Sequence, residues 1–266
     1  MHAETISSPK NSQIKDLVRL HEGKHRRRQQ RFIIEGQREL ERALEAGIKP
    51  EAFYFSSEIQ ANLPRGIESK ITEFGCPCYN LTKIAFEKAS LRENPDGILA
   101  IAPIQWKKLD EISVGETPFV LVMEQIEKPG NLGTLLRTAD AAGVDLVIIS
   151  EPIIDASHPQ VIRNSQGGVF GMPVTVATNE ETMEWLEAKG IQMVATTPAA
   201  TEKLWNVDYK KSTAMFLGSE AYGLSDFWLK SGKITPISIP MAGIGDSLNV
   251  AAAAAISLFE VVRQRS

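Results

Sequence analysis

The chain has 266 residues, of which 43% are hydrophobic and 23% charged, values typical of a soluble globular protein with room for two domains. Its apolar runs are too short to span a bilayer, and its polar, basic start has no segment of a secretory signal, so we expect a cytoplasmic protein with no membrane partner. Two cysteines, Cys76 and Cys78, and four scattered histidines match neither a disulfide framework nor a zinc site, so no metal is expected.

The net charge of −4 is unevenly distributed. Residues 1–31 carry eight Lys and Arg against three Asp and Glu, a net +5, which leaves 21 basic and 30 acidic residues, or −9, for the rest of the chain. A concentrated positive segment is typical of proteins that contact phosphate backbones. A solvated helix face beside an acidic body explains the charge equally well.

The first hundred residues alternate between strands and helices, which is the pattern of a small α/β domain. Residues 7–31 resemble one polar helix, and we expect a basic helical extension (1–31), an α/β domain (32–103) and a linker (104–117). The expected strands and helices are, in order, FIIEG (32–36), helix 37–47, EAFYFSS, helix 67–74, CPCYNLT, helix 83–91, the turn ENPDG and the strand GILAIAP.

A second α/β run fills residues 118–266. Its strands are continuously apolar, which predicts a parallel sheet that is buried on both faces. The expected strands are 118–124, 144–150, 173–177, 191–196, 213–218 and 234–240, and the expected helices are 132–142, 159–170, 180–189, 224–231 and 247–263.

Three polar clusters follow strands of this sheet, where such folds bind ligands. The first runs from Lys128 to Asp140 and contains Asn131, an expected helix N-cap, and Arg137. The second is LGSEAYGL (217–224), with Glu220 in a loop. The third is IPMAGIGDSLNV (239–250), a glycine-rich loop before a helix that we expect Ser247 to open. Each cluster taken alone also fits an ordinary strand–loop–helix joint, and an arginine such as Arg137 is most often a surface or salt-bridged residue.

Two other site types are poorly supported. The dinucleotide-binding fingerprint is absent, since Gly243 and Gly245 stand without the third glycine. A nucleophilic triad of Asp155, Ser157 and His158 would have to form within one loop, which is too local.

In this order, N-x-G-x-x-x-R-T-A, L-G-S-E-x-x-G-L and I-P-M-x-G-x-x-x-S-L-N-V-A-x-A resemble the three motifs of the SpoU/TrmH family of RNA ribose 2′-O-methyltransferases. The resemblance covers residues 118–263, and residues 32–102 resemble the ribosomal-protein-like substrate-binding domain of many members. It implies a SPOUT catalytic domain over 118–266 with a deep trefoil knot, S-adenosylmethionine (AdoMet) as cofactor, and a homodimer formed through this domain.

The resemblance also assigns residues to roles. The implied catalytic residues are Arg137, Asn131, Glu220, Ser247 and Asn249. The implied cofactor-binding residues are Thr196, Thr197, Leu217, Gly218, Glu220, Ile237, Ile239, Met241, Ser247, Leu248 and Asn249.

Arg137 is the implied activator of the ribose hydroxyl. Because arginine stays protonated unless it is strongly desolvated, positioning of the ribose and its phosphate is the alternative to acting as a base. The chain departs from the family at Lys128, where an acidic or amide residue is common, and at Ala221-Tyr222, where glycine often follows the glutamate. These departures concern substrate contacts and loop shape.

RNA is the implied partner, since only RNA has a 2′-hydroxyl. Arg26, Arg27, Arg28, Arg31 and Arg163 are the expected phosphate contacts. Ribosomal RNA of the large subunit is favoured over tRNA, and the nucleotide, as well as a housekeeping or antibiotic-resistance role, stays open. The alternatives are a tRNA 2′-O-methyltransferase, a non-catalytic RNA-binding or ribosome-assembly protein of the same fold, and a nucleotide-dependent dehydrogenase, which lacks its fingerprint.

Overall fold

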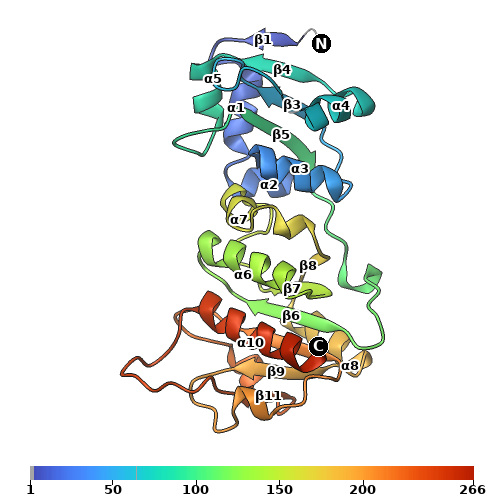
Figure 1. Cartoon of the computed structure of the whole chain (residues 1–266), viewed down its shortest axis with the longest axis vertical. Coiled ribbons are helices and arrows are strands. Elements are labelled where there is room, and N and C mark those ends of the chain that lie inside the picture. The colour runs from blue at the N-terminus through green and yellow to red at the C-terminus, as the bar shows by residue number, and fades with distance from the viewer. Residues whose placement is uncertain (1–2, 64) are drawn as a thin grey trace. The chain divides into compact units, whose positions relative to one another are not determined.

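The computed structural model describes residues 3–63 and 65–266 (Figure 1). Contacts divide the chain into two compact units. The N-terminal unit contains the chain up to Gln105 together with Asp155–Gly171, and the C-terminal unit contains Trp106–Ile154 and Met172–Ser266. The segment 155–171 therefore packs with the first hundred residues, although it lies inside the second α/β run of the sequence.

The N-terminal unit is built on a five-stranded mixed sheet in the order β1-β4-β3-β5-β2. β5 runs antiparallel to β2 and β3, whereas β4 runs parallel to β1 and β3. The strands are β1 (Glu4–Ile6), β2 (Arg31–Glu35), β3 (Ala52–Phe55), β4 (Cys78–Leu81) and β5 (Ile98–Pro103).

Helices complete this unit. They are α1 (Ser12–Arg19), α2 (Gly23–Gln29), α3 (Gln37–Glu45), α4 (Arg65–Phe74), α5 (Lys83–Ala89), α7 (Pro159–Asn164) and the 3₁₀ turn η2 (Gly168–Phe170). α1 begins where the Asn11 side chain accepts a hydrogen bond from the backbone N–H of Gln13 at 2.8 Å, and it buries Ile14 and Leu17.

The expectation of one helix over residues 7–31 was wrong. The chain forms β1 and then two helices, because α1 ends at Leu20 and α2 begins at Gly23. α2 in turn ends at Gln30, whose φ of 54° is left-handed and turns the chain into β2.

The C-terminal unit contains a six-stranded sheet in the order β11-β9-β10-β6-β7-β8. Every pairing is parallel, as the continuously apolar strands predicted. The strands are β6 (Phe119–Glu124), β7 (Leu146–Ser150), β8 (Val174–Ala177), β9 (Gln192–Thr196), β10 (Thr213–Leu217) and β11 (Ile234–Ile237).

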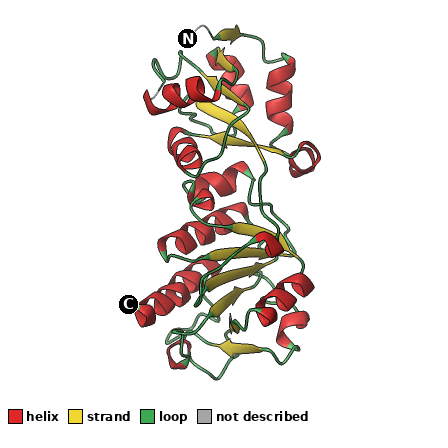
Figure 2. Ribbon diagram, turned by 90° about the vertical axis from the view of Figure 1, so that its right-hand side faces the viewer, coloured by secondary structure: helices red, strands yellow, loops and turns green. Residues whose placement is uncertain are grey.

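Helices lie on both sides of this sheet (Figure 2). α6 and α10 pack against each other, and Trp228 of α9 is fully buried with its ring centroid 4.6 Å from that of Phe216. The helices and turns are α6 (Pro129–Ala141), α8 (Asn179–Ala188), α9 (Asp226–Leu229), α10 (Val250–Arg265), η1 (Leu109–Glu111) and η3 (Leu204–Asn206). Within the described part of the chain, no helix is long and apolar enough to cross a membrane.

Two predicted helix starts were wrong. α6 begins at Pro129 with Lys128 at the N-cap, because proline has the helical φ and lacks only an N–H that the first turn does not use, so Asn131 lies inside the helix. α10 begins at Val250, where the Asn249 side chain accepts from the N–H of Ala251 at 2.9 Å, rather than at Ser247.

Candidate active site

A cavity of about 480 Å³ opens in the C-terminal unit at the carboxyl ends of β9 and β10, beside the loop 238–249 and the first turn of α10. This is the edge at which parallel α/β sheets bind ligands. Its lining residues are Thr196, Thr197, Pro198, Leu217, Gly218, Ser219, Glu220, Tyr222, Gly223, Ile239, Met241, Asp246, Ser247, Leu248, Asn249, Val250 and Ala253.

Ten of the eleven implied cofactor-binding residues line this cavity. The exception is Ile237, which is fully buried at the end of β11 and is not part of the lining. The sequence analysis assigned no cofactor-binding role to Tyr222, Asp246 or Val250, although all three lie within the second and third clusters.

One wall of the cavity is formed by the tight loop that follows β10. Ser219 and Gly223 exchange two backbone hydrogen bonds, each 2.9 Å long. A Cβ at Gly218 would overlap the backbone of Gly223, and Gly223 has a left-handed φ of 70°. The two glycines of the second motif are therefore required by the shape of this loop.

Glu220 joins this loop to the start of α6. Its carboxylate accepts a hydrogen bond from Nζ of Lys128 at 2.8 Å and a short one from Nδ2 of Asn131. The hydrogen bond from Lys128 lowers the pKa of Glu220, and the same bond raises the pKa of Lys128. The first and second motifs thus meet directly, and Lys128, which departs from the family pattern, takes part in the contact.

Arg137 lies on the same helix but away from the cavity lining. It is exposed, and no hydrogen bond or ion pair engages its guanidinium within the described ranges. In the single chain, this side chain is therefore in contact with water, and its guanidinium N–H donors are available to a ligand.

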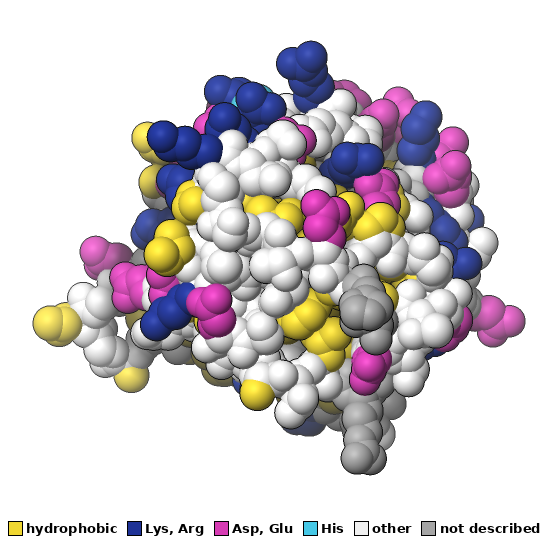
Figure 3. Space-filling model, turned by 90° about the horizontal axis from the view of Figure 1, so that it is seen from above, with side chains coloured by type: hydrophobic (Ala, Val, Ile, Leu, Met, Phe, Trp, Pro, Cys, Tyr) yellow, Lys and Arg dark blue, Asp and Glu magenta, His cyan; other side chains and the backbone are white. Residues whose placement is uncertain are grey.

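The expected RNA-contacting arginines differ in their surroundings. Arg27, Arg28, Arg31 and Arg163 are exposed, and Arg31 also pairs with Glu51 at 2.7 Å. In the view from above (Figure 3), Lys and Arg side chains lie along the left, top and right margins of the face, with Asp and Glu side chains among them.

Arg26 departs from the expectation, because its side chain is only 1% exposed. It donates to both carboxylate oxygens of Asp155, at 3.2 and 2.6 Å, and to the carbonyl oxygens of Leu20 and His21 at 2.9 and 2.7 Å. With its donors used inside the unit, Arg26 is a structural residue and not a phosphate contact.

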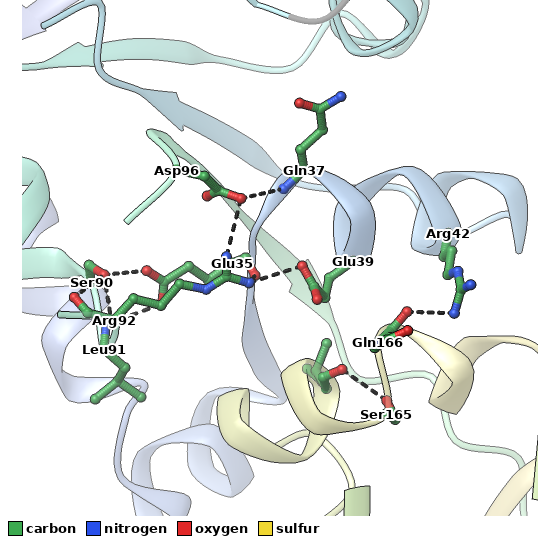
Figure 4. Close-up of polar contacts among 11 residues, drawn as sticks. Glu35, Gln37, Glu39, Arg42, Ser90, Leu91, Arg92, Asp96, Ser165 and Gln166 are labelled. Carbon is green, nitrogen blue, oxygen red and sulfur yellow. Dashed lines mark hydrogen bonds and ion pairs between the residues drawn. The ribbon is translucent and has the colours of Figure 1, made fainter. Parts of the chain in front are cut away.

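A second buried polar cluster lies in the N-terminal unit (Figure 4). Arg92 donates to the carbonyl oxygen of Glu35 at 2.7 Å, to Glu39 at 2.9 Å and to Asp96 at 3.1 Å. A side chain at Gly36, whose φ is 113°, would overlap Arg92 and Glu39. The FIIEG and ENPDG segments therefore hold each other in place.

Two protein-family models match the chain. The model of the SpoU rRNA Methylase family matches residues 118–259, and that of the MRM3-like substrate binding domain matches residues 11–100. The chain is 31% identical over 257 residues to the 23S rRNA (guanosine(2553)-2′-O)-methyltransferase RlmP of Bacillus subtilis, covering 96% of this chain and 98% of that protein.

Solved structures agree along the whole chain. A crystal structure of an RNA 2′-O ribose methyltransferase has a TM-score of 0.83 and 38% identity, covering 98% of this chain and 99% of its own. The AdoMet-bound rRNA methyltransferase from Sinorhizobium meliloti has a TM-score of 0.87 and 30% identity, covering 98% of both chains. The chain therefore belongs to the SpoU methylase family and has an N-terminal substrate-binding domain of the MRM3-like type.

Proposed function

We propose that this protein is an AdoMet-dependent methyltransferase that modifies a ribose 2′-hydroxyl in large-subunit rRNA. The observation that carries this proposal is the cavity in the C-terminal unit, on which residues of the second and third motifs converge while Asn131 of the first motif holds Glu220. The membership in the SpoU family supports the same reaction.

The cavity suits AdoMet in size and chemistry. Its volume of about 480 Å³ lies in the range of small-molecule sites. Leu217, Ile239 and Leu248 offer apolar contacts to adenine, while Thr197 and Ser247 offer hydroxyl groups to the polar parts of the cofactor. When bound, AdoMet supplies an electrophilic methyl group on a positively charged sulfur.

Glu220 has an electrostatic role in this proposal. Because the hydrogen bond from Lys128 lowers its pKa, the carboxylate stays ionised at neutral pH and puts negative charge on the cavity wall. The Lys128 ammonium offsets part of this charge, but Lys128 is exposed and does not line the cavity, so the wall itself presents a carboxylate. Asn131 fixes the direction of the carboxylate, and this keeps the wall in one geometry.

Arg137 positions the RNA. Its side chain is exposed on α6, and no hydrogen bond or ion pair among the described residues uses its donors. A planar fork of donors can hold the ribose and its phosphate in line with the methyl group.

A second copy of the chain completes the proposed enzyme. α10 packs against α6 and exposes Ile256 and Phe259, which are 44% and 47% accessible, on one side of the helix. Large apolar side chains on an exposed helix face support a homodimer through the C-terminal unit. The trefoil knot and the cytoplasmic location stay predictions from the sequence.

Ribosomal RNA is the proposed substrate because RlmP and other relatives, such as the Streptomyces viridochromogenes enzyme, are named as 23S rRNA methyltransferases. The N-terminal unit supplies exposed Arg27 and Arg28 for phosphate contacts.

The test offers one purified protein several RNAs with methyl-labelled AdoMet: protein-free 23S-type rRNA, intact large subunits and bulk tRNA, all from cells that lack the protein. We expect label at one nucleotide of the large rRNA, and we expect the phosphodiester after it to resist alkaline hydrolysis because the 2′-oxygen is methylated. Label in tRNA alone would reject the rRNA substrate, and label on a base would reject the 2′-hydroxyl.

A further inference from the structure

Glu124 is a buried carboxylate at the carboxyl end of β6, with only 1% of its surface exposed. Its Oε1 accepts hydrogen bonds from Nδ2 of Asn179 at 2.7 Å and from Oγ of Ser225 at 2.6 Å. Its Oε2 accepts from the backbone N–H of Ser225 at 2.7 Å. Across the described ranges, no Lys, Arg or His forms an ion pair with it. A carboxylate is rarely buried without a charged partner, so the burial of Glu124 requires an explanation.

Asn179 has a single possible orientation. Its Oδ1 accepts from Oγ of Ser150 at 2.6 Å and from Nε1 of the buried Trp228 at 2.9 Å. Because an indole N–H can only donate, the side-chain oxygen must face Trp228 and the amide nitrogen must face Glu124. The network therefore has a fixed direction, from Trp228 through Asn179 to the carboxylate.

The backbone is constrained at the same place. Gln125 and Glu151, which directly follow Glu124 and Ser150, have left-handed φ values of 52° and 46°. Non-glycine residues keep such conformations where their surroundings hold them, and they gather at functional sites. The Glu151 carboxylate also accepts from the N–H of Asn179 at 3.0 Å.

This network supports one wall of the cofactor cavity. The second-motif loop (residues 218–225) contributes Gly218, Glu220, Tyr222 and Gly223 to the lining, and it ends at Ser225. Glu220 ties the tip of the loop to Asn131 of α6, and Glu124 ties the base of the loop to β6, the strand that leads into α6.

We propose that Glu124 is a positioning residue for the cofactor: its carboxylate, directed by Asn179, holds Ser225 and thereby fixes the second-motif loop in its AdoMet-binding shape. The inference rests on the proposed binding of AdoMet. A loop that is preorganised by buried hydrogen bonds binds its ligand more tightly, because less ordering remains to be done on binding.

Four variants test this role. Glu124→Gln places an amide N–H against a group that now donates to Glu124, such as Nδ2 of Asn179. Ser225→Ala removes only the bond from the Ser225 hydroxyl and keeps the other two hydrogen bonds to Glu124. The double variant Glu124→Gln with Asn179→Asp restores a donor–acceptor match, since the new amide at position 124 can then donate to the new carboxylate at position 179, which still accepts from Trp228. The control is Thr175→Val, which removes a buried hydroxyl that donates to the carbonyl oxygen of Lys107 at 2.8 Å, on β8 and away from the loop.

The dissociation constant for AdoMet is measured by calorimetry, and the melting temperature is recorded for each variant. We expect Glu124→Gln to weaken AdoMet binding at least tenfold, equivalent to about 1.4 kcal/mol, Ser225→Ala about threefold, and Thr175→Val less than twofold. The double variant is expected to recover most of the affinity. In turnover assays, the KM for AdoMet should rise while the KM for RNA stays within twofold.

Each outcome has one meaning. If the wild-type protein does not bind AdoMet, the proposed function itself is wrong. If it binds AdoMet but Glu124→Gln and Ser225→Ala keep the wild-type affinity, or if Thr175→Val loses as much affinity for an equal loss of melting temperature, the positioning role is refuted. If Glu124→Gln does not fold, Ser225→Ala and the double variant decide the question alone.

Discussion

Replacing Arg26 by methionine tests whether this arginine stabilises the fold or contacts RNA phosphate, two roles that the charge of residues 1–31 does not distinguish. Arg26 is buried, and its guanidinium donates to both oxygens of Asp155 and to two backbone carbonyls. Breaking a buried ion pair by removal of one partner costs about 3–5 kcal/mol. Because Asp155 is 24% exposed and water can partly solvate it, we expect a loss near the lower end, about 3 kcal/mol.

The matched control is Arg28→Met, two residues along the same helix at an exposed site without an ion pair among the described residues. It should change stability by less than about 0.5 kcal/mol. If Arg28 contacts a phosphate, its loss should also lower the slope of log affinity for RNA against log salt concentration by about 0.7–0.9. Arg26→Met should leave that slope unchanged under conditions in which the protein is folded.

Urea unfolding followed by circular dichroism measures the stability difference. All four tryptophans lie in the C-terminal unit, so their fluorescence provides an internal reference for the unit that was not altered. An Arg26→Met protein of wild-type stability, or one that loses the same salt slope as Arg28→Met, would show that the burial of Arg26 has been misread.

The same ion pair predicts a pH dependence. Burial raises the pKa of Asp155, but hydrogen bonds from Arg26 and Ser157 outweigh it, so the pKa lies below its ordinary value. A carboxyl group with a lowered pKa contributes stability above its unfolded pKa of about 3.9 and loses it as the pH falls through the lower, folded value. We therefore expect the gap in stability between wild type and Arg26→Met to be constant near neutral pH. It should shrink as the pH falls through the acidic range, beginning where Asp155 of the variant, still buried but without its arginine, starts to bind a proton.

Three further variants test the C-terminal unit. Arg137→Lys should nearly abolish methyl transfer while AdoMet affinity stays within about threefold, because an ammonium lacks the planar fork; wild-type turnover would remove Arg137 from the proposed site. Gly218→Ala should weaken AdoMet binding at least about tenfold, because its Cβ would meet the backbone of Gly223, and calorimetry gives the answer directly. Phe259→Glu should convert a dimer into a monomer in light-scattering measurements, since it puts a charge on the exposed apolar face of α10; an unchanged dimer would place the interface elsewhere.

Much of the fold follows from local patterns. Continuously apolar strands such as Phe119–Glu124 predicted the parallel sheet, because a strand that is buried on both faces has no polar side. Helix starts were less predictable. Ser247 and Asn131 are both good capping residues, yet Asn249 caps α10, and α6 starts after Lys128, which makes no side-chain capping bond, because Pro129 already has the helical φ.

Local sequence patterns could not predict the burial of Arg26. Arg26, Arg27 and Arg28 are identical in type and adjacent in the chain, and only one of them is buried. What selects it is Asp155, 129 positions away, on a segment that packs with the N-terminal unit. A charge count of residues 1–31 treats all three alike, so the sequence analysis expected Arg26 to contact phosphate in the same way as its exposed neighbours.

Lys128 shows how a departure from a family pattern can be interpreted once its partner is known. In the sequence it stands alone as an unusual residue before Pro129, and nothing near it suggests a contact. In the structure it donates to Glu220, a glutamate of the second motif 92 positions away. Because Lys128 is 68% exposed, salt and water screen this bond, and it adds little to stability. Its effect is local: it adds a second donor to the carboxylate that Asn131 already holds, so the position and ionisation of Glu220 depend on Lys128 at the N-cap of α6 and on Asn131 in its first turn.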